Sequence, residues 1–161
     1  MSKTGTIYGI NGPVIYLAGN TGFKMSEMVY VGKEKLVGEV IYLDKDCTTI
    51  QVYEETSGLK PGEIVEASGE AVSVTLAPGI LDNIFDGIER PLERIAENAG
   101  AFITRGISVD SLDMEKLWDT KLVVNEGDIL HGGDIYAQVQ ETRAIVHKCM
   151  VPPDLTGTVT F

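Results

Sequence analysis

The stretch Gly5–Gly19 is GTIYGINGPVIYLAG, in which two apolar runs lie on either side of an Asn-Gly pair. Asparagine and glycine tolerate the backbone geometry of tight turns, so the stretch predicts a strand, a turn at Asn11-Gly12 and a second strand. Similar runs between turn residues continue to residue 76. The complete set of predicted strands is 5–10, 13–18, 28–31, 36–43, 48–53, 63–67 and 72–76.

The spacing of these short strands predicts a small closed β-barrel over residues 1–76, because closure removes exposed sheet edges. Alternation supports it in TTIQVYEE, where Ile50 and Val52 share one face. It recurs in AVSVTL, where Val72, Val74 and Leu76 share a face. The 18 glycines, an unusually large number for 161 residues, agree with many tight turns.

The next segment, ILDNIFDGIERPLERIAENAG, has a different pattern. Ile80, Ile84 and Phe85 have helical spacing, which predicts a first helix. Pro91 is expected in the first turn of a second helix, and Gly100 is expected to end it. The apolar faces of these helices need a partner, so the segment is neither barrel nor linker.

Strands are predicted again from Ala101. The run GDILHGGDIYAQV contains two Gly-Asp turn pairs six residues apart, and ETRAIVHKCMVPP and LTGTVTF follow. This pattern predicts a second small β unit, which resembles part of a biotinyl/lipoyl-like β barrel-sandwich. Because the sequence ends on Phe161 within or just after a predicted strand, we expect a truncation there.

The predicted fold class is therefore mainly β, in three parts. Residues 1–76 are expected to form the N-terminal barrel, 77–108 a helical segment, and 109–161 a second β region that is expected to be incomplete.

Composition excludes several classes of function. A net charge of −11 disfavours nucleic-acid binding, since phosphate backbones are negative. No stretch approaches the roughly 20 apolar residues of a membrane span, and the start does not resemble a secretory signal. Cys47 and Cys149 are far apart and unaccompanied, which predicts reduced thiols in the cytosol.

The sequence contains no recognisable catalytic set. ATP phosphates usually need a GxxxxGK[ST] loop, and neither this motif nor GxGxxG is present. His131 and His147 are 16 residues apart and lack the spacing of zinc ligands. Acidic pairs such as Glu54-Glu55 fall in predicted loops. We therefore expect no catalytic, cofactor-binding or metal-binding residue in this chain.

A family resemblance covers nearly the whole chain. GTIYGINGPVIYLAG resembles the opening strand pair of the hexamer-forming subunits of rotary ATPases. The most specific piece is PGILDNIFDGIERPL, Pro78–Leu92. It resembles the passage of V/A-type (vacuolar/archaeal-type) catalytic A subunits where the barrel crosses into the nucleotide-binding core. The region from Phe102 onwards resembles the first part of the bulge of those subunits.

This resemblance implies a parent enzyme that couples ATP hydrolysis or synthesis to proton or sodium transport. The ATP and Mg sites of such a parent lie beyond Phe161, so the chain alone is expected to be inactive. The implied partners are B subunits of an alternating hexamer and, near the bulge, the peripheral stalk. The implied location is cytoplasmic and peripheral to the membrane, without direct membrane contact.

Other interpretations remain open from the residues. The last forty residues also resemble a biotinyl or lipoyl carrier domain, whose cofactor is attached to a lysine at a hairpin tip. Here the tip is Glu141–Ala144 and Lys148 lies on the returning strand, which suggests the fold without its chemistry. An unrelated all-β binding protein would explain the strands but not Pro78–Leu92, and a stand-alone enzyme is the weakest candidate.

Overall fold

The computed structural model describes residues 3–19, 21–81, 83–100 and 102–160. The chain divides into two compact units. The barrel unit comprises Met1–Val74 and Asn98–Ser108, and the sandwich unit comprises Thr75–Glu97 and Val109–Phe161. The three-part division at residues 76 and 108 stays a prediction.

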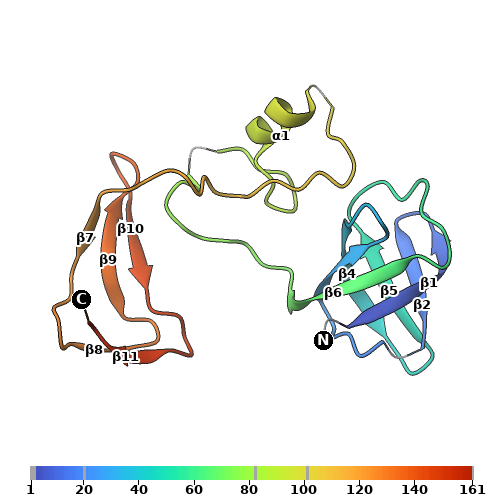
Figure 1. Cartoon of the computed structure of the whole chain (residues 1–161), viewed down its shortest axis with the longest axis horizontal. Helices are drawn as coiled ribbons and strands as arrows, with labels where there is room; N and C mark the ends of the chain where they lie inside the picture. Colours follow the sequence, from blue (N-terminus) through green and yellow to red (C-terminus); the bar gives the residue numbers. More distant parts are fainter. Residues whose placement is uncertain (1–2, 20, 82, 101, 161) are drawn as a thin grey trace. The chain divides into compact units, whose positions relative to one another are not determined.

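Six antiparallel strands close into a barrel in the order β1-β2-β5-β4-β3-β6 (Figure 1). Their bounds are β1 (Thr4–Asn11), β2 (Val14–Ala18), β3 (Glu27–Val31), β4 (Leu36–Leu43), β5 (Cys47–Val52) and β6 (Ile64–Ala71). The sequence-based prediction of a small closed barrel is confirmed.

The barrel encloses a continuous apolar core. Its buried members come from every strand and from the loop after β2: Ile7, Ile15, Leu17, Phe23, Val29, Val31, Leu36, Val40, Ile50, Val52 and Val65. The alternation predicted in β5 is correct, since Ile50 and Val52 are 0% and 2% exposed. Alternation buries one face of each strand because successive side chains point to opposite sides.

The seventh predicted strand, 72–76, is wrong. Strand β6 ends at Ala71, and Val72, Val74 and Leu76 are 40%, 61% and 72% exposed. The physical reason is closure: β6 already pairs with β1 and β3, so no free edge remains for another strand. Alternation alone cannot report whether a partner edge exists.

The first predicted helix is also wrong. Among the described residues of 80–91 the backbone forms turns, with an isolated bridge between Phe85 and Pro91. Asp86 accepts hydrogen bonds from the backbone of Ile88 and Arg90, and such side-chain bonds compete with helix formation. The second predicted helix is confirmed as α1 (Leu92–Ala99), which starts after Pro91 and ends before Gly100.

Five short strands form the β part of the sandwich unit. They are β7 (Thr120–Leu122), β8 (Ile129–His131), β9 (Ile135–Gln140), β10 (Val146–Met150) and β11 (Thr156–Thr158). One sheet has the order β10-β9-β7, and the other pairs β11 with β8 (Figure 1). The expected fold class, mainly β with a barrel and a barrel-sandwich region, is confirmed.

The two Gly-Asp pairs form equivalent turns. Asp128 accepts a hydrogen bond from the backbone of Asn125 at 2.8 Å, and Asp134 accepts one from His131 at 2.7 Å. Each carboxylate therefore closes a four-residue turn, a local motif in which aspartate satisfies a backbone donor. These turns flank β8 and set its length.

Candidate functional site

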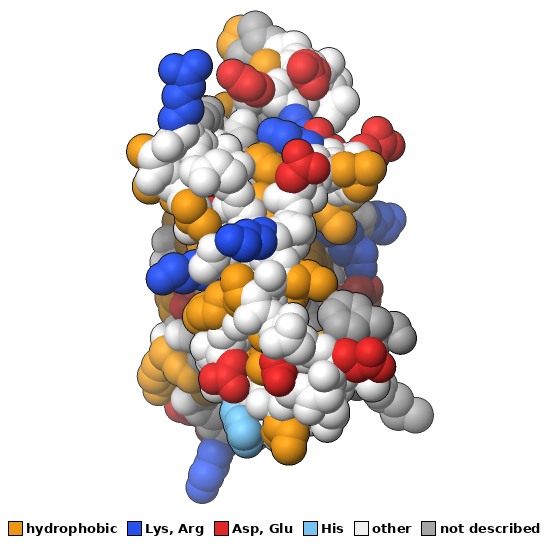
Figure 2. Space-filling view, turned by 90° about the vertical axis from the view of Figure 1, so that its left-hand side faces the viewer, with side chains coloured by type: hydrophobic (Ala, Val, Ile, Leu, Met, Phe, Trp, Pro, Cys, Tyr) orange, Lys and Arg blue, Asp and Glu red, His pale blue; other side chains and the backbone are white. Residues whose placement is uncertain are grey.

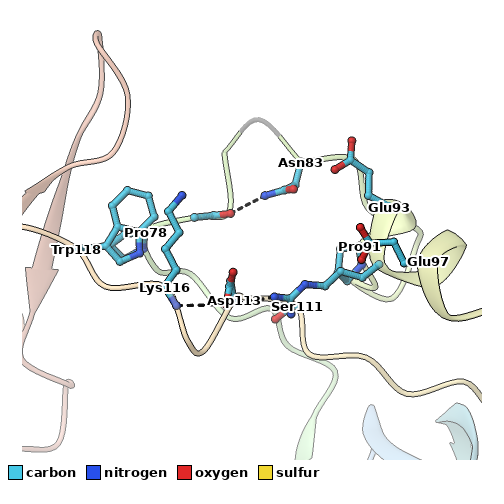
Figure 3. Close-up of a pocket in the computed structure, with 11 residues that line it drawn as sticks. Pro78, Asn83, Pro91, Glu93, Glu97, Ser111, Asp113, Lys116 and Trp118 are labelled. Carbon is cyan, nitrogen blue, oxygen red and sulfur yellow. Dashed lines mark hydrogen bonds and ion pairs between the residues drawn. The ribbon is translucent and has the colours of Figure 1, made fainter.

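A polar cavity of about 350 Å³ lies within the sandwich unit (Figure 3). Its walls come from helix α1, the segment before it and the segment leading to β7. The lining residues are Pro78, Gly79, Asn83, Pro91, Glu93, Arg94, Glu97, Ser111, Asp113, Lys116 and Trp118. Glu93 and Glu97 are one helical turn apart, so both reach the cavity from the same face of α1.

The cationic side chains that line this cavity are engaged in contacts within the chain. Arg94 donates to the carbonyl of Leu112 at 2.9 Å and lies 3.4 Å from the Asp113 carboxylate. The Lys116 ammonium is 4.1 Å from the centroid of the Trp118 ring, within the range of a cation–π contact. These contacts therefore hold together the segments that surround the cavity. The described lining residues include no nucleophile that is activated by an adjacent base.

The turn before α1 is organised by a half-buried ion pair. The Asp86 carboxylate accepts backbone bonds from Ile88 and Arg90, and the Arg90 Nε atom lies 2.8 Å from it. Burial opposes ionisation, but these hydrogen bonds outweigh it and hold the pKa of Asp86 below its ordinary value. Glu89 adds a second link, because its carboxylate accepts from the backbone of Thr75 at 2.8 Å.

Within the barrel unit, the segment 104–107 is attached by a network around one guanidinium group. Arg105 Nη2 donates to Glu34 Oε1 at 2.7 Å, and its Nε lies 2.5 Å from Glu34 Oε2. The same side chain donates to the carbonyl of Ser57, and the backbone of Gly106 donates to Glu54 at 2.9 Å. A forked pair of this kind fixes orientation as well as position. We call this network the Arg105 clamp.

A second cavity, of about 460 Å³, adjoins the Arg105 clamp. Glu63 is one of its lining residues and accepts hydrogen bonds from the backbone of Lys60 at 3.0 Å and of Lys33 at 3.3 Å. The carboxylate thus occupies the backbone donors that a bound anion would need. This geometry favours a role for Glu63 in joining the two loops that contain Lys33 and Lys60.

Comparison with known families matches both β regions. The β-barrel domain of the ATP synthase alpha/beta family matches residues 7–69, and the barrel-sandwich domain of the ATP synthase alpha/beta subunit matches residues 109–161. A V-type ATP synthase alpha chain 2 from Clostridium tetani is 57% identical over 159 residues, 99% of this chain. The chain belongs to the family of V-type and A-type ATP synthase A (alpha) chains.

Other members of the A-chain family agree with this assignment. The V-type ATP synthase alpha chain of Halothermothrix orenii is 51% identical over 159 residues, and the A-type ATP synthase A subunit of Methanosarcina barkeri is 50% identical over 160. Each alignment covers 99% of this chain. The chain spans 27% of the length of the two V-type relatives and 28% of the A-type relative.

In this A-chain family member, the histidines and cysteines singled out from the sequence do not meet. His131 is exposed on β8, 3.7 Å from Asp134, and His147 lies on β10, 3.9 Å from Glu141. Both cysteines are free thiols. Within the described ranges, no three His, Cys, Asp or Glu side chains converge as metal ligands. The expectation that the chain holds no catalytic, cofactor or metal site stays a prediction.

The hairpin tip bears on the carrier-domain alternative. The turn between β9 and β10 consists of Glu141–Ile145, and Lys148 lies inside β10, paired with Gln138. Carrier domains have their cofactor-bearing lysine at the hairpin tip, and a lysine within a strand does not match that arrangement. No helix in the described part of the chain has the length and apolar character to cross a membrane.

Sequence reasoning missed the residues that organise both units. Arg105, Glu54 and Glu141 each bond to backbone groups distant in sequence. Only the charge of these side chains was visible beforehand, and charged residues outside a motif are usually solvated. Figure 2 shows that apolar, acidic and basic side chains are mixed on the face that it presents.

Proposed function

We propose that this chain is the part of a V/A-type ATP synthase catalytic subunit that serves hexamer assembly and stalk-facing contacts. The complete enzyme couples ATP hydrolysis or synthesis to proton or sodium transport, and acts in the cytoplasm on the membrane periphery. The observation that carries the proposal is 57% identity to a V-type alpha chain over 99% of this chain. ATP and Mg bind outside these residues.

The outer surface of the barrel supports the assembly role. Tyr8, Tyr42 and Tyr53 are 75%, 53% and 42% exposed. Register places Tyr16 and Tyr42 on either side of Thr49, across β2, β5 and β4. Exposed tyrosines are enriched in protein interfaces because they bury large area at low entropic cost. We propose that this tyrosine face contacts a neighbouring B subunit.

Reconstitution of the full-length protein with B subunits tests this. Tyr42→Ala is expected to reduce the hexamer fraction several-fold, as loss of an interface aromatic often costs about 1–3 kcal/mol. Tyr42→Phe is the matched control, since it keeps the ring and removes only the hydroxyl contact to Asp44. Hexamers that assemble equally well with Tyr42→Ala would place the contact elsewhere.

The absence of an ATP site in these residues is tested separately. Calorimetry of the chain with Mg-ATP is expected to give no micromolar binding, because no phosphate-binding loop is present in the sequence. Saturable binding at micromolar concentration would overturn that part of the proposal without affecting the assembly role.

A further inference from the structure

The hairpin between β9 and β10 carries a buried carboxylate. The side chain of Glu141 is 3% exposed, and its Oε1 atom accepts hydrogen bonds from the backbone of Gly79 at 2.7 Å and of Leu81 at 3.1 Å. The partners are about sixty residues away in sequence. Burying a carboxylate is costly unless hydrogen bonds compensate, so this contact has a specific geometry to maintain.

The tip that presents Glu141 is itself held in shape. The backbone of Glu141 donates to the carbonyl of Ile145 at 3.1 Å, and Gln140 Nε2 donates to the carbonyl of Thr142 at 2.6 Å. His147 Nδ1 lies 3.9 Å from Glu141 Oε2. The carboxylate therefore needs little reorganisation to reach the turn at 78–81.

Apolar contact around this link is incomplete. A groove of about 370 Å³ lies between the two segments, lined on one side by Leu76, Ala77, Ile80 and Leu81 and on the other by Ile145–Lys148. Leu81, Ile145 and Val146 are 40%, 47% and 44% exposed. Hydrogen bonds to a carboxylate are stronger than hydrogen bonds to a neutral acceptor. Because apolar burial between the two segments is partial, we expect the hydrogen bonds of Glu141 to contribute most of the attachment.

We propose that Glu141 is a latch that fastens the β9–β10 hairpin to the turn at 78–81. With the latch closed, hairpin and turn move as one body. With the carboxylate removed, the backbone N–H groups of Gly79 and Leu81 lose their acceptor, and the turn separates from the hairpin to reach water. The inference goes beyond the proposed assembly role and is independent of it.

Amide hydrogen exchange of the whole chain tests the latch directly. In Glu141→Ala, the amides of Gly79 and Leu81 are expected to exchange about tenfold faster or more, as loss of charged hydrogen bonds implies. Glu141→Gln keeps an acceptor oxygen and is expected to give a smaller increase. The amide of Thr75, bonded to Glu89, should not change.

Glu89→Ala is the matched control, because it removes a carboxylate with a similar backbone contact in the same unit. It should accelerate Thr75 and leave Gly79 and Leu81 unchanged. Barrel amides such as that of Ile50 serve as an internal reference for global unfolding. If Glu141→Ala unfolds the sandwich unit, Glu141→Gln provides the decisive comparison.

Separation of the two segments requires its own readout. Methyl resonances of Ile145 and Val146 should shift in Glu141→Ala, and their cross-relaxation with Leu76 and Ile80 should weaken. Faster amide exchange with unchanged methyl contacts would mean that a hydrogen bond was lost without opening, which overturns the latch. Unchanged exchange at Gly79 and Leu81 in both Glu141 variants would overturn it as well.

Discussion

The barrel unit and the sandwich unit are built from similar short antiparallel strands but bury very different amounts of apolar surface. Among the described residues, eleven buried apolar side chains form the barrel core, whereas the sandwich unit buries Pro91, Ile95, Ala137 and Val139. Every barrel strand has two neighbours, while β7, β8, β10 and β11 each pair with one described strand. Closure, rather than strand content, therefore decides where the apolar core forms.

Polar contacts join the segments of the sandwich unit. They include the Arg94 contacts and the hydrogen bonds of Glu141, while the Asp86–Arg90 pair stabilises the turn before α1. Such links are directional and worth less than a filled core, so we expect the sandwich unit to open first under stress. The following variants test this difference.

The largest expected effect is in the barrel core. Ile50→Ala removes a fully buried side chain from a closed core and should lower the free energy of unfolding by about 3 kcal/mol. Urea denaturation followed by circular dichroism measures it. Ile129→Ala, at a side chain 65% exposed on β8, is the control and should stay within about 0.5 kcal/mol of wild type. Equal losses would refute the contrast between the units.

A second variant tests packing in the sandwich unit. A Cβ atom on Gly132 would lie 2.1 Å from the carbonyl oxygen of Pro153, so Gly132→Ala must displace backbone. We expect Gly132→Ala to lower the free energy of unfolding by about 2 kcal/mol, as substitutions that overpack a site do. Gly157→Ala is matched, since nothing lies within 4 Å of its Cβ position. Limited proteolysis of 121–160 should distinguish the two; similar resistance would show that this close approach is easily relieved.

The Arg105 clamp provides a polar link within the barrel unit. Arg105→Ala should release residues 104–107, because it removes the fork to Glu34 and the bond to Ser57. Faster exchange of the Gly106 amide reports it, while the barrel core amides should be unaffected. Gly106 itself has φ +70° and abuts the Glu34 carbonyl, so Gly106→Ala should give the same result.

Lys35→Ala is the control for charge loss nearby. It breaks an exposed pair with Glu66 and should leave the exchange of Gly106 unchanged. If Arg105→Ala leaves that amide equally protected, the segment is held by other contacts and the clamp is incidental.

The smallest expected effect is a pH dependence of the turn before α1. The pKa of Asp86 is lowered in the folded chain, so its stabilising contribution is present above the ordinary carboxyl pKa of about 4. It is lost as pH falls through the lower, folded value. Exchange of the Ile88 amide should therefore rise on acidification beyond the intrinsic trend. Asp86→Asn should remove the extra dependence; a wild-type curve identical to that of Asp86→Asn would contradict it.

The sequence alone determined the β class, six barrel strands, helix α1 and the family. These features depend on local alternation, turn residues and motifs such as PGILDNIFDGIERPL, all readable over a few residues. Tertiary structure decided that the barrel closes without residues 72–76 and that Asp86 replaces a helix by a turn. It also decided the roles of Glu141 and Arg105. Their partners are backbone groups dozens of residues away, and backbone donors and acceptors are the same at every position, so no residue pattern announces them.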